Sequence, residues 1–126
     1  MKLSLLSELF NNEINVDTFK GIIQEEVEQY RISLNKKGSS TAIYVNEDCT
    51  LCFRSKDLLR LCKYYLDNIL TVFEINYIAD CLTIPESVTF EKQELFEFLE
   101  EMTDPEVNGI LTKERISSII SVLELQ

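Results

Sequence analysis

The stretch from Ser55 to Leu82 constrains the fold of this chain more than any other part of the sequence. Its apolar residues recur at steps of three and four, the spacing that gathers side chains on one face of an α-helix. Thr71 and Val72 are β-branched and have weaker helix preference, so we expect two helices joined by a short connection rather than one bent helix. The first series is Leu58, Leu59, Cys62, Tyr65, Leu66, Ile69 and Phe73, and the second is Ile75, Ile78, Ala79 and Leu82.

The length of 126 residues and the hydrophobic fraction of 45% indicate one folded domain, residues 1–126, with a continuous core. No run approaches the roughly 18 uninterrupted apolar residues that a membrane span requires. The first residues, MKLSLLSELFNNE, lack the long apolar core and the small-residue cleavage site of a signal peptide. We therefore expect a cytoplasmic protein without a membrane segment.

Helical spacing also recurs on both sides of the central stretch. Leu3, Leu6 and Phe10 predict a first amphipathic helix. Asp17 is suited to cap a second, long helix that ends near Lys36, Lys37 and Gly38. The apolar residues that keep helical spacing in this second helix are Phe19, Ile22, Ile23, Val27, Tyr30 and Leu34.

The segment from Thr41 to Phe53 is typical of strands instead. TAIYV and CTLCF are rich in strand formers, and the Asn-Glu-Asp between them resembles a turn, so we expect a small β-hairpin near residues 41–53. A hairpin is marginal alone and needs helices or another strand beside it. SVTF, residues 87–90, is the other short candidate strand, and Ser55 with Asp57 suits a capped helix start directly after the hairpin.

Two further helices are predicted after Pro85, whose ring ends the central stretch. Thr89 can cap a helix from about Phe90 to Thr103, with Leu95, Phe98, Leu99 and Met102 facing inward. Thr112 can cap a last helix whose inner residues are Ile116, Ile119, Ile120 and Leu123. The predicted fold is a mainly α, single-domain bundle of about five to six helices with one hairpin.

The four cysteines give only a weak metal signal. A zinc site built from four cysteines usually shows two close pairs, and here only Cys49 and Cys52 are close. A strand would point these two to opposite faces. Cys62 and Cys81 fall on apolar helix faces, where a reduced cysteine behaves as a small hydrophobe. We expect free thiols in a reducing compartment and no bound metal.

The sequence also argues against catalysis. The absence of histidine excludes Ser-His and Cys-His nucleophile pairs and the commonest general base. The three glycines, Gly21, Gly38 and Gly109, are too far apart for a phosphate-binding loop. Residues 104–111 contain an Asn-Gly turn but too few correctly spaced acids for a calcium loop. We expect neither an enzyme nor a cofactor.

Acidic residues outnumber basic ones by 22 to 12, which gives a net charge of −10. Residues 86–106 hold eight acids and one base, whereas residues 1–85 hold twelve acids and nine bases. Such a surface repels phosphates and anionic lipids, so direct binding of nucleic acid or membrane is not expected. Helical spacing predicts an outward acidic stripe of Glu94, Glu97, Glu101 and Asp104, flanked by Glu91 and Glu100, and Glu106 extends the negative charge into the next loop.

This acidic stripe has two interpretations. It can be a solvated helix face that only keeps the protein in solution. It can also be a docking surface, because a face kept for solubility normally mixes both signs of charge and gains ion pairs along the helix. The near absence of lysine from the stripe and its continuation into the following loop favour a basic protein partner.

Residues 70–120 contain a helix ending EINYIADCL, an acid-rich helix, and TDPEVNG before a last short helix. In these features the segment resembles small acidic immunity proteins encoded beside bacterial polymorphic toxins, including those of contact-dependent growth-inhibition systems. The resemblance implies a cytosolic, non-catalytic inhibitor of a cognate toxin domain, often a nuclease with a basic substrate cleft. It assigns no role to single residues, because immunity interfaces differ between families.

We therefore hypothesise that the chain is an inhibitor whose acidic stripe blocks the basic active-site cleft of a toxin. The expected toxin is a nuclease. The rival hypothesis is an adaptor or assembly subunit that binds a protein through an apolar patch around Tyr44, Phe53 and Tyr64. The two differ in salt dependence, because only binding through the stripe weakens strongly as ionic strength rises. The oligomeric state does not follow from the sequence.

Overall fold

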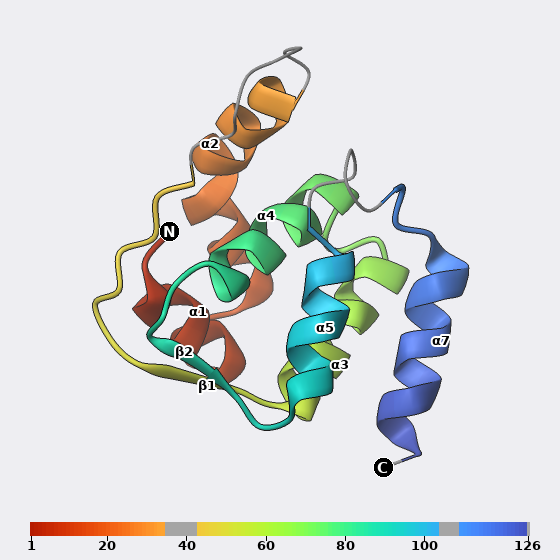
Figure 1. The fold of residues 1–126 in the computed structure, drawn as a ribbon. Helices are drawn as coiled ribbons and strands as arrows, with labels where there is room; N and C mark the ends of the chain where they lie inside the picture. The colour runs from red at the N-terminus through yellow and green to blue at the C-terminus, as the bar shows by residue number, and fades with distance from the viewer. Residues whose placement is uncertain (35–42, 104–108, 126) are drawn as a thin grey trace.

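The computed structural model describes residues 1–34, 43–103 and 109–125. These residues form six helices and two short strands (Figure 1). The mainly helical prediction is thereby confirmed. In chain order the elements are α1 Leu3–Phe10, α2 Val16–Leu34, β1 Leu51–Phe53, α3 Ser55–Leu66, α4 Val72–Thr83, β2 Val88–Phe90, α5 Gln93–Glu101 and α7 Lys113–Glu124.

The central stretch forms the predicted helix pair, α3 and α4. Asn68, with φ of 59°, lies in the connection, a conformation that asparagine adopts more readily than most residues. Thr71 then starts α4: its Oγ1 accepts a hydrogen bond from the Glu74 backbone N–H (3.2 Å), and the Glu74 carboxylate accepts one from the Thr71 N–H (2.8 Å). This reciprocal capping pattern makes the break between the helices a local property of the sequence.

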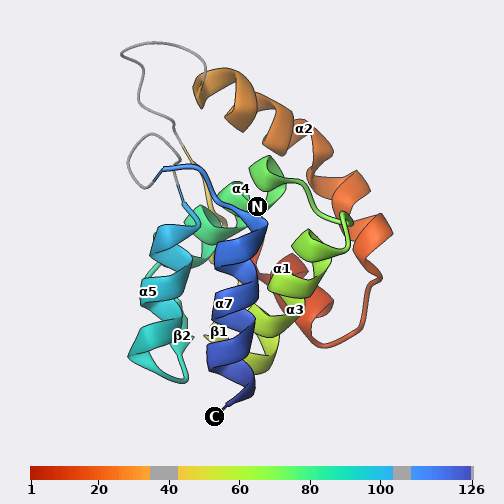
Figure 2. The same ribbon diagram turned by 90° about the vertical axis from the view of Figure 1, so that its right-hand side faces the viewer.

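The other helices pack around this pair. α3 lies against α7, whereas α4 contacts both α2 and α5. Figure 2 shows α7 between α5 and α3. The apolar faces meet in one continuous core to which each of the six described helices contributes. Its largest fully buried side chains are Phe19, Phe53, Leu3, Leu6, Leu9, Ile23, Leu58, Leu61, Leu70, Ile78, Leu82 and Leu95.

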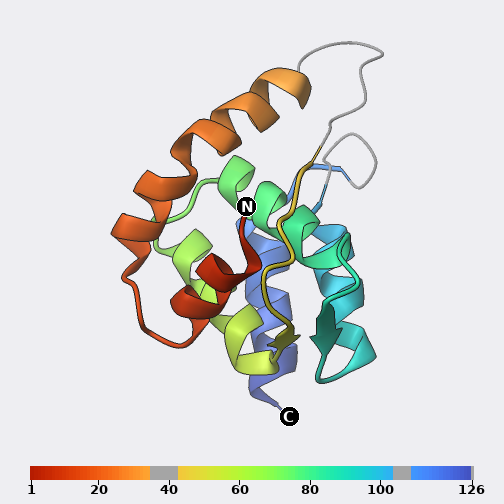
Figure 3. The ribbon, with the colours of Figure 1, turned by 90° about the vertical axis from the view of Figure 1, so that its left-hand side faces the viewer.

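The β-hairpin prediction is wrong. β1 pairs in parallel with β2, with Leu51 opposite Val88 and Phe53 opposite Phe90 (Figure 3). Parallel strands require a long crossover connection, and α3 with α4 provides it. Residues 43–45 form no strand, and Asn46 makes only an isolated bridge with Lys2. Residues 41 and 42 of the predicted hairpin lie outside the described residues.

Two predicted helix starts are also wrong. α2 begins at Val16, and Asn15 rather than Asp17 caps it, since the Asn15 Oδ1 accepts from the Thr18 N–H (2.8 Å). Thr89 lies within β2, so α5 starts only at Gln93. Thr112 caps α7 as predicted, because its Oγ1 accepts from the Arg115 N–H (3.1 Å). The predicted end of α2 at residues 36–38 lies outside the described residues.

Within the described ranges, no helix has both the length and the apolar character needed to cross a membrane.

Candidate functional site

The acid-rich helix α5 has one apolar and one acidic side. Leu95 and Leu99 are fully buried in the core, as is Met102 at the end of the helix. Glu97, Glu100 and Glu101 are exposed on the outer side, where residues three and four positions apart are neighbours. The structure therefore brings together the central part of the predicted stripe, which we call the α5 acidic face: Glu97, Glu100 and Glu101.

The remaining predicted stripe residues are placed differently. Glu94 is half-buried, and Glu91 lies between β2 and α5 rather than on the helix. The Glu91 carboxylate accepts a hydrogen bond from the Ser55 hydroxyl (3.1 Å), and its N–H donates to the Phe53 carbonyl (2.9 Å). Glu91 is thus held at the edge of the acidic face by β1 and the start of α3. Asp104 and Glu106 lie outside the described residues.

Glu101 has a partner that helical spacing did not indicate. The Arg115 guanidinium from α7 donates to both carboxylate oxygens, from Nη2 to Oε1 (2.6 Å) and from Nε to Oε2 (2.8 Å). The same guanidinium lies over the ring of Phe98 (5.9 Å from Cζ to the centroid) and donates to the Ser118 hydroxyl (3.1 Å). Periodicity within one helix cannot reveal a partner that the fold brings from another helix.

Arg115 thereby ties one end of the acidic face to α7. Its hydrogen bonds hold the pKa of the Glu101 carboxyl below the ordinary value, and its charge adds to this effect. In contrast, neither Glu97 nor Glu100 forms an ion pair with another described residue. These two carboxylates are the part of the face most readily available to a cationic partner.

The lowered pKa of Glu101 gives a pH-dependent prediction. Because the folded-state pKa lies below the unfolded-state value, the stabilisation is present at neutral pH and is lost as the pH falls through the folded-state pKa. In an Arg115→Met variant, the Glu101 pKa should rise toward its ordinary value. Side-chain carboxyl chemical shifts followed against pH measure this change. Ser118→Ala, which leaves the guanidinium–carboxylate contact in place, should keep the Glu101 pKa low.

Asn76 on α4 fixes the C-terminal end of α5. The residue is only 1% exposed, and its Nδ2 donates to the carbonyls of Met102 (2.6 Å) and Thr103 (3.3 Å). The last carbonyls of a helix have no partner within the helix, so a side-chain donor there satisfies groups that burial would otherwise leave unpaired. Asn76 therefore sets where the last turn of α5, with Glu100 and Glu101, lies on the surface.

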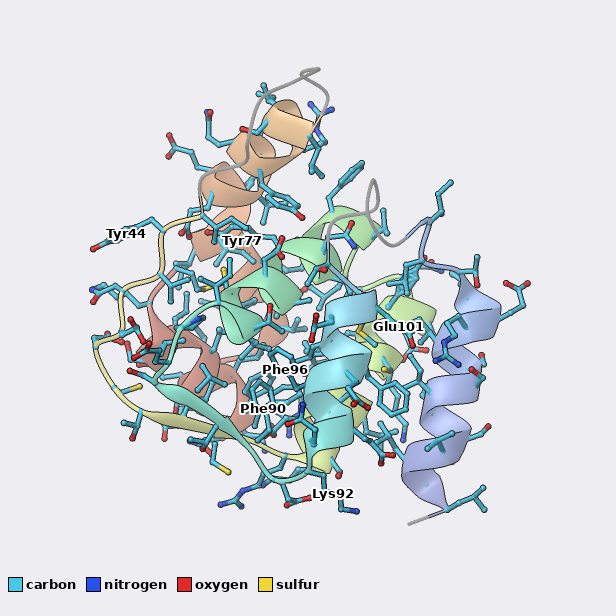
Figure 4. The ribbon with its side chains drawn as sticks, viewed as in Figure 1. Tyr44, Tyr77, Phe90, Lys92, Phe96 and Glu101 are labelled. Carbon is cyan, nitrogen blue, oxygen red and sulfur yellow. The ribbon has the colours of Figure 1, made fainter. Side chains whose placement is uncertain are left out.

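The apolar patch of the rival adaptor hypothesis does not form. Tyr44 is 77% exposed, but Phe53 is 0% exposed and Tyr64 is only half-buried. Phe53 instead lies between the rings of Phe10 (5.5 Å) and Phe90 (6.0 Å). Figure 4 shows Phe90 and Phe96 near the start of α5, where their rings are also in contact. The aromatic side chains in this region hold the sheet and α5 together.

The cysteines divide into buried and accessible thiols. Cys62 and Cys81 are buried, as predicted, and burial raises the pKa of each to about 12. Cys49 is half-buried, with a pKa raised by burial, and Cys52 is exposed on β1. Among the described residues, no group of three or more potential ligands from His, Cys, Asp and Glu is arranged to hold a metal ion.

This division predicts the thiol reactivity of the native protein. Only thiolates react rapidly, so at about pH 8 Cys52 should react first with an alkylating reagent such as iodoacetamide and Cys49 more slowly. Cys62 and Cys81 should react only after denaturant is added. Peptide mass spectrometry of alkylated protein identifies each site. Equal labelling of all four cysteines under native conditions would contradict the described packing.

Comparisons with protein-family models, with curated proteins and with solved structures found no match to this chain.

Proposed function

We propose that this chain is a non-catalytic protein inhibitor that binds a positively charged protein domain through the α5 acidic face. The observation that carries the proposal is that Glu97 and Glu100 are exposed beside Glu101 on one side of α5. Among the described residues, Arg115 is the one cation that forms an ion pair with these three carboxylates, and it pairs with Glu101. A cationic partner would gain long-range attraction from this face and from the net charge of −10.

Local stability does not explain this arrangement. Glu100 and Glu101 lie in the last turn of α5, where the helix dipole is negative and carboxylates are disfavoured by about 0.3–1 kcal/mol each. Like charges three and four residues apart add roughly 0.2–0.5 kcal/mol per pair. Residues that oppose local stability are expected where a functional surface requires them. Arg115 compensates for this cost at Glu101.

The proposed partner is a toxin domain, and more specifically a nuclease. A nuclease binds phosphates in a cleft lined by basic residues, and carboxylates presented on a rigid helix can occupy such a cleft in place of phosphates. Asn76 and Arg115 both hold the C-terminal end of this face in place, which reduces the ordering cost of binding. The resemblance to small acidic immunity proteins supports the same partner class.

Co-expression with a panel of basic nuclease toxin domains tests the proposal. One toxin should co-purify with the chain in a stoichiometric complex and lose its nuclease activity. A panel of acidic protein domains of similar size provides the control for non-specific association. Failure to protect cells from any basic toxin, together with no complex by gel filtration, would reject the inhibitor function.

A further inference from the structure

A second surface for interaction lies on α2, apart from the α5 acidic face. In Figure 2, α2 runs along the upper right of the molecule and α5 lies at the lower left. The inner side of α2 packs against α1 and α4. Polar residues recur on its outer side at steps of three and four, which place them on one face of the helix. We call this the α2 outer face: Asp17, Lys20, Gly21, Gln24, Glu28 and Arg31.

The α2 outer face is open to an incoming helix. Lys20 and Arg31 are half-buried, and the other four residues of the face are exposed. A cavity of about 500 Å³ adjoins the face, between α2 and the first turn of α4. Val27 and the half-buried Phe73 give this cavity an apolar part. A second helix beside α2 would remove some of this apolar surface from water, which favours association.

Gly21 is a residue that the packing of this chain does not require. It lies within α2, where glycine is less favourable than alanine by about 0.5–1 kcal/mol. A Cβ at this position would meet no atom of the described residues within 4 Å. Glycine on a helix surface allows the backbone of a neighbouring helix to approach closely. Its place on the α2 outer face therefore suits a contact with another chain.

The charges of the α2 outer face are arranged symmetrically about Gln24. Asp17 and Arg31 lie seven residues before and after Gln24, and Lys20 and Glu28 lie four residues before and after it. In an antiparallel pair of identical helices with a two-fold axis at Gln24, residues equally far from the axis on opposite sides become neighbours. Asp17 would then meet Arg31 of the second copy, and Lys20 would meet Glu28. The two-fold symmetry makes each pair twice.

Contacts within one chain leave these groups able to pair with a second copy. Asp17 forms no ion pair with another described residue. Arg31 pairs with Glu28 (2.5 Å), but their side chains remain 41% and 52% exposed. A guanidinium has five donors and a carboxylate has two oxygens, so this pair can persist while each member gains a further partner. Lys20 donates to the Ile69 carbonyl (2.6 Å) and has donors left.

We propose that this chain forms an antiparallel, two-fold dimer through the α2 outer face, with Gln24 at the axis and Gly21 at the close approach of the helices. The symmetric charges, the open face and the glycine that internal packing does not require all fit a second copy of the same chain. The proposal does not depend on the inhibitor function, because α5 lies on another side of the molecule (Figure 2).

Sedimentation equilibrium of the full chain at protein concentrations up to about 1 mM tests for the dimer. The net charge of −10 on each copy opposes association. A salt concentration of about 0.15 M screens this repulsion beyond about 8 Å and largely keeps the ion pairs in contact. Under these conditions the chain should show a monomer–dimer equilibrium.

Gly21→Leu should weaken dimerisation about tenfold or more, because a large side chain separates the two helices. The monomer should keep its helical circular dichroism, since the added side chain projects into open space. Gln29→Leu is the matched control, because it adds the same side chain at an exposed position of α2 outside the α2 outer face. This control should leave the dimer unchanged.

A charge exchange tests the register. Asp17→Lys and Arg31→Glu should each weaken the homodimer about fivefold or more, because like charges then face each other twice. An equimolar mixture of the two variants should form a heterodimer, since the introduced lysine faces the introduced glutamate while the unchanged Arg31 and Asp17 still meet. Native mass spectrometry with one variant ¹⁵N-labelled measures the heterodimer.

Three results would overturn the proposal. The first is a chain that stays monomeric up to about 1 mM. The second is a dimer that persists unchanged in Gly21→Leu, which would place the contact on another surface. The third is a mixture of the two charge variants that associates no more than each variant alone.

Discussion

Replacing Phe53 by alanine is expected to lower the free energy of unfolding by about 3–5 kcal/mol. Phe53 is fully buried and contacts aromatic rings on α1 and β2, so its removal leaves a cavity where three elements meet. It also lies opposite Phe90 in the parallel strand pair, so the change loosens the connection between β1 and β2. The predicted loss is a large part of the roughly 5–15 kcal/mol that usually stabilises a domain.

Urea denaturation, followed by far-ultraviolet circular dichroism, measures this loss. Tyr44→Ala is the matched control, because it removes an exposed ring and should change the free energy of unfolding by no more than about 0.5 kcal/mol. Phe53→Leu keeps part of the buried volume and should fall between the two variants. Equal stability of Phe53→Ala and Tyr44→Ala would contradict the position of Phe53 in the core.

Reversing the charge of Glu97 and Glu100 together should slow association with the proposed toxin about tenfold or more at low ionic strength. Each change to lysine alters the net charge by two, so the double variant has a net charge of −6 instead of −10. Neither carboxylate has an ion-pair partner among the described residues, so the fold should be preserved. Stopped-flow association rates at several salt concentrations measure the effect.

The control variant carries the same change in net charge on another surface. Glu13→Lys with Glu25→Lys reverses two exposed carboxylates before and within α2 and also gives a net charge of −6. If the α5 acidic face docks the partner, this control should slow association much less. The difference should diminish at about 1 M salt, where charges are screened within about 3 Å. Equal slowing in both variants would indicate that only net charge matters, and no slowing would remove α5 from the interface.

The sequence by itself determined the features that depend on neighbouring residues. The break between α3 and α4 follows from the capping pattern of Thr71 and Glu74, which lies within four residues. Apolar spacing along each helix also indicates which face is buried, including Cys62 and Cys81. The cap at Thr112 follows from the residue type at the start of α7. Helix hydrogen bonds join residues four apart, so such patterns can be read along the chain.

The outer position of Glu97, Glu100 and Glu101 also follows from local sequence, because the opposite face of α5 is strongly apolar. The predicted start of α5 near Phe90 was wrong, because the residues of SVTF can form either a strand or the segment that leads into a helix. The presence of β1 decided between them by offering a partner for residues 88–90. Strand formation therefore depended on a segment more than thirty residues away.

Only the tertiary structure decided which distant groups meet. The parallel pairing of Leu51–Phe53 with Val88–Phe90 replaced the local hairpin, Arg115 reached Glu101 from another helix, and Glu26 met Tyr77 across the packed helices. None of these contacts follows from a spacing along the chain. They form because burying the apolar faces of α3, α4 and α5 fixes the relative positions of the helices, and the polar groups at their edges then find partners.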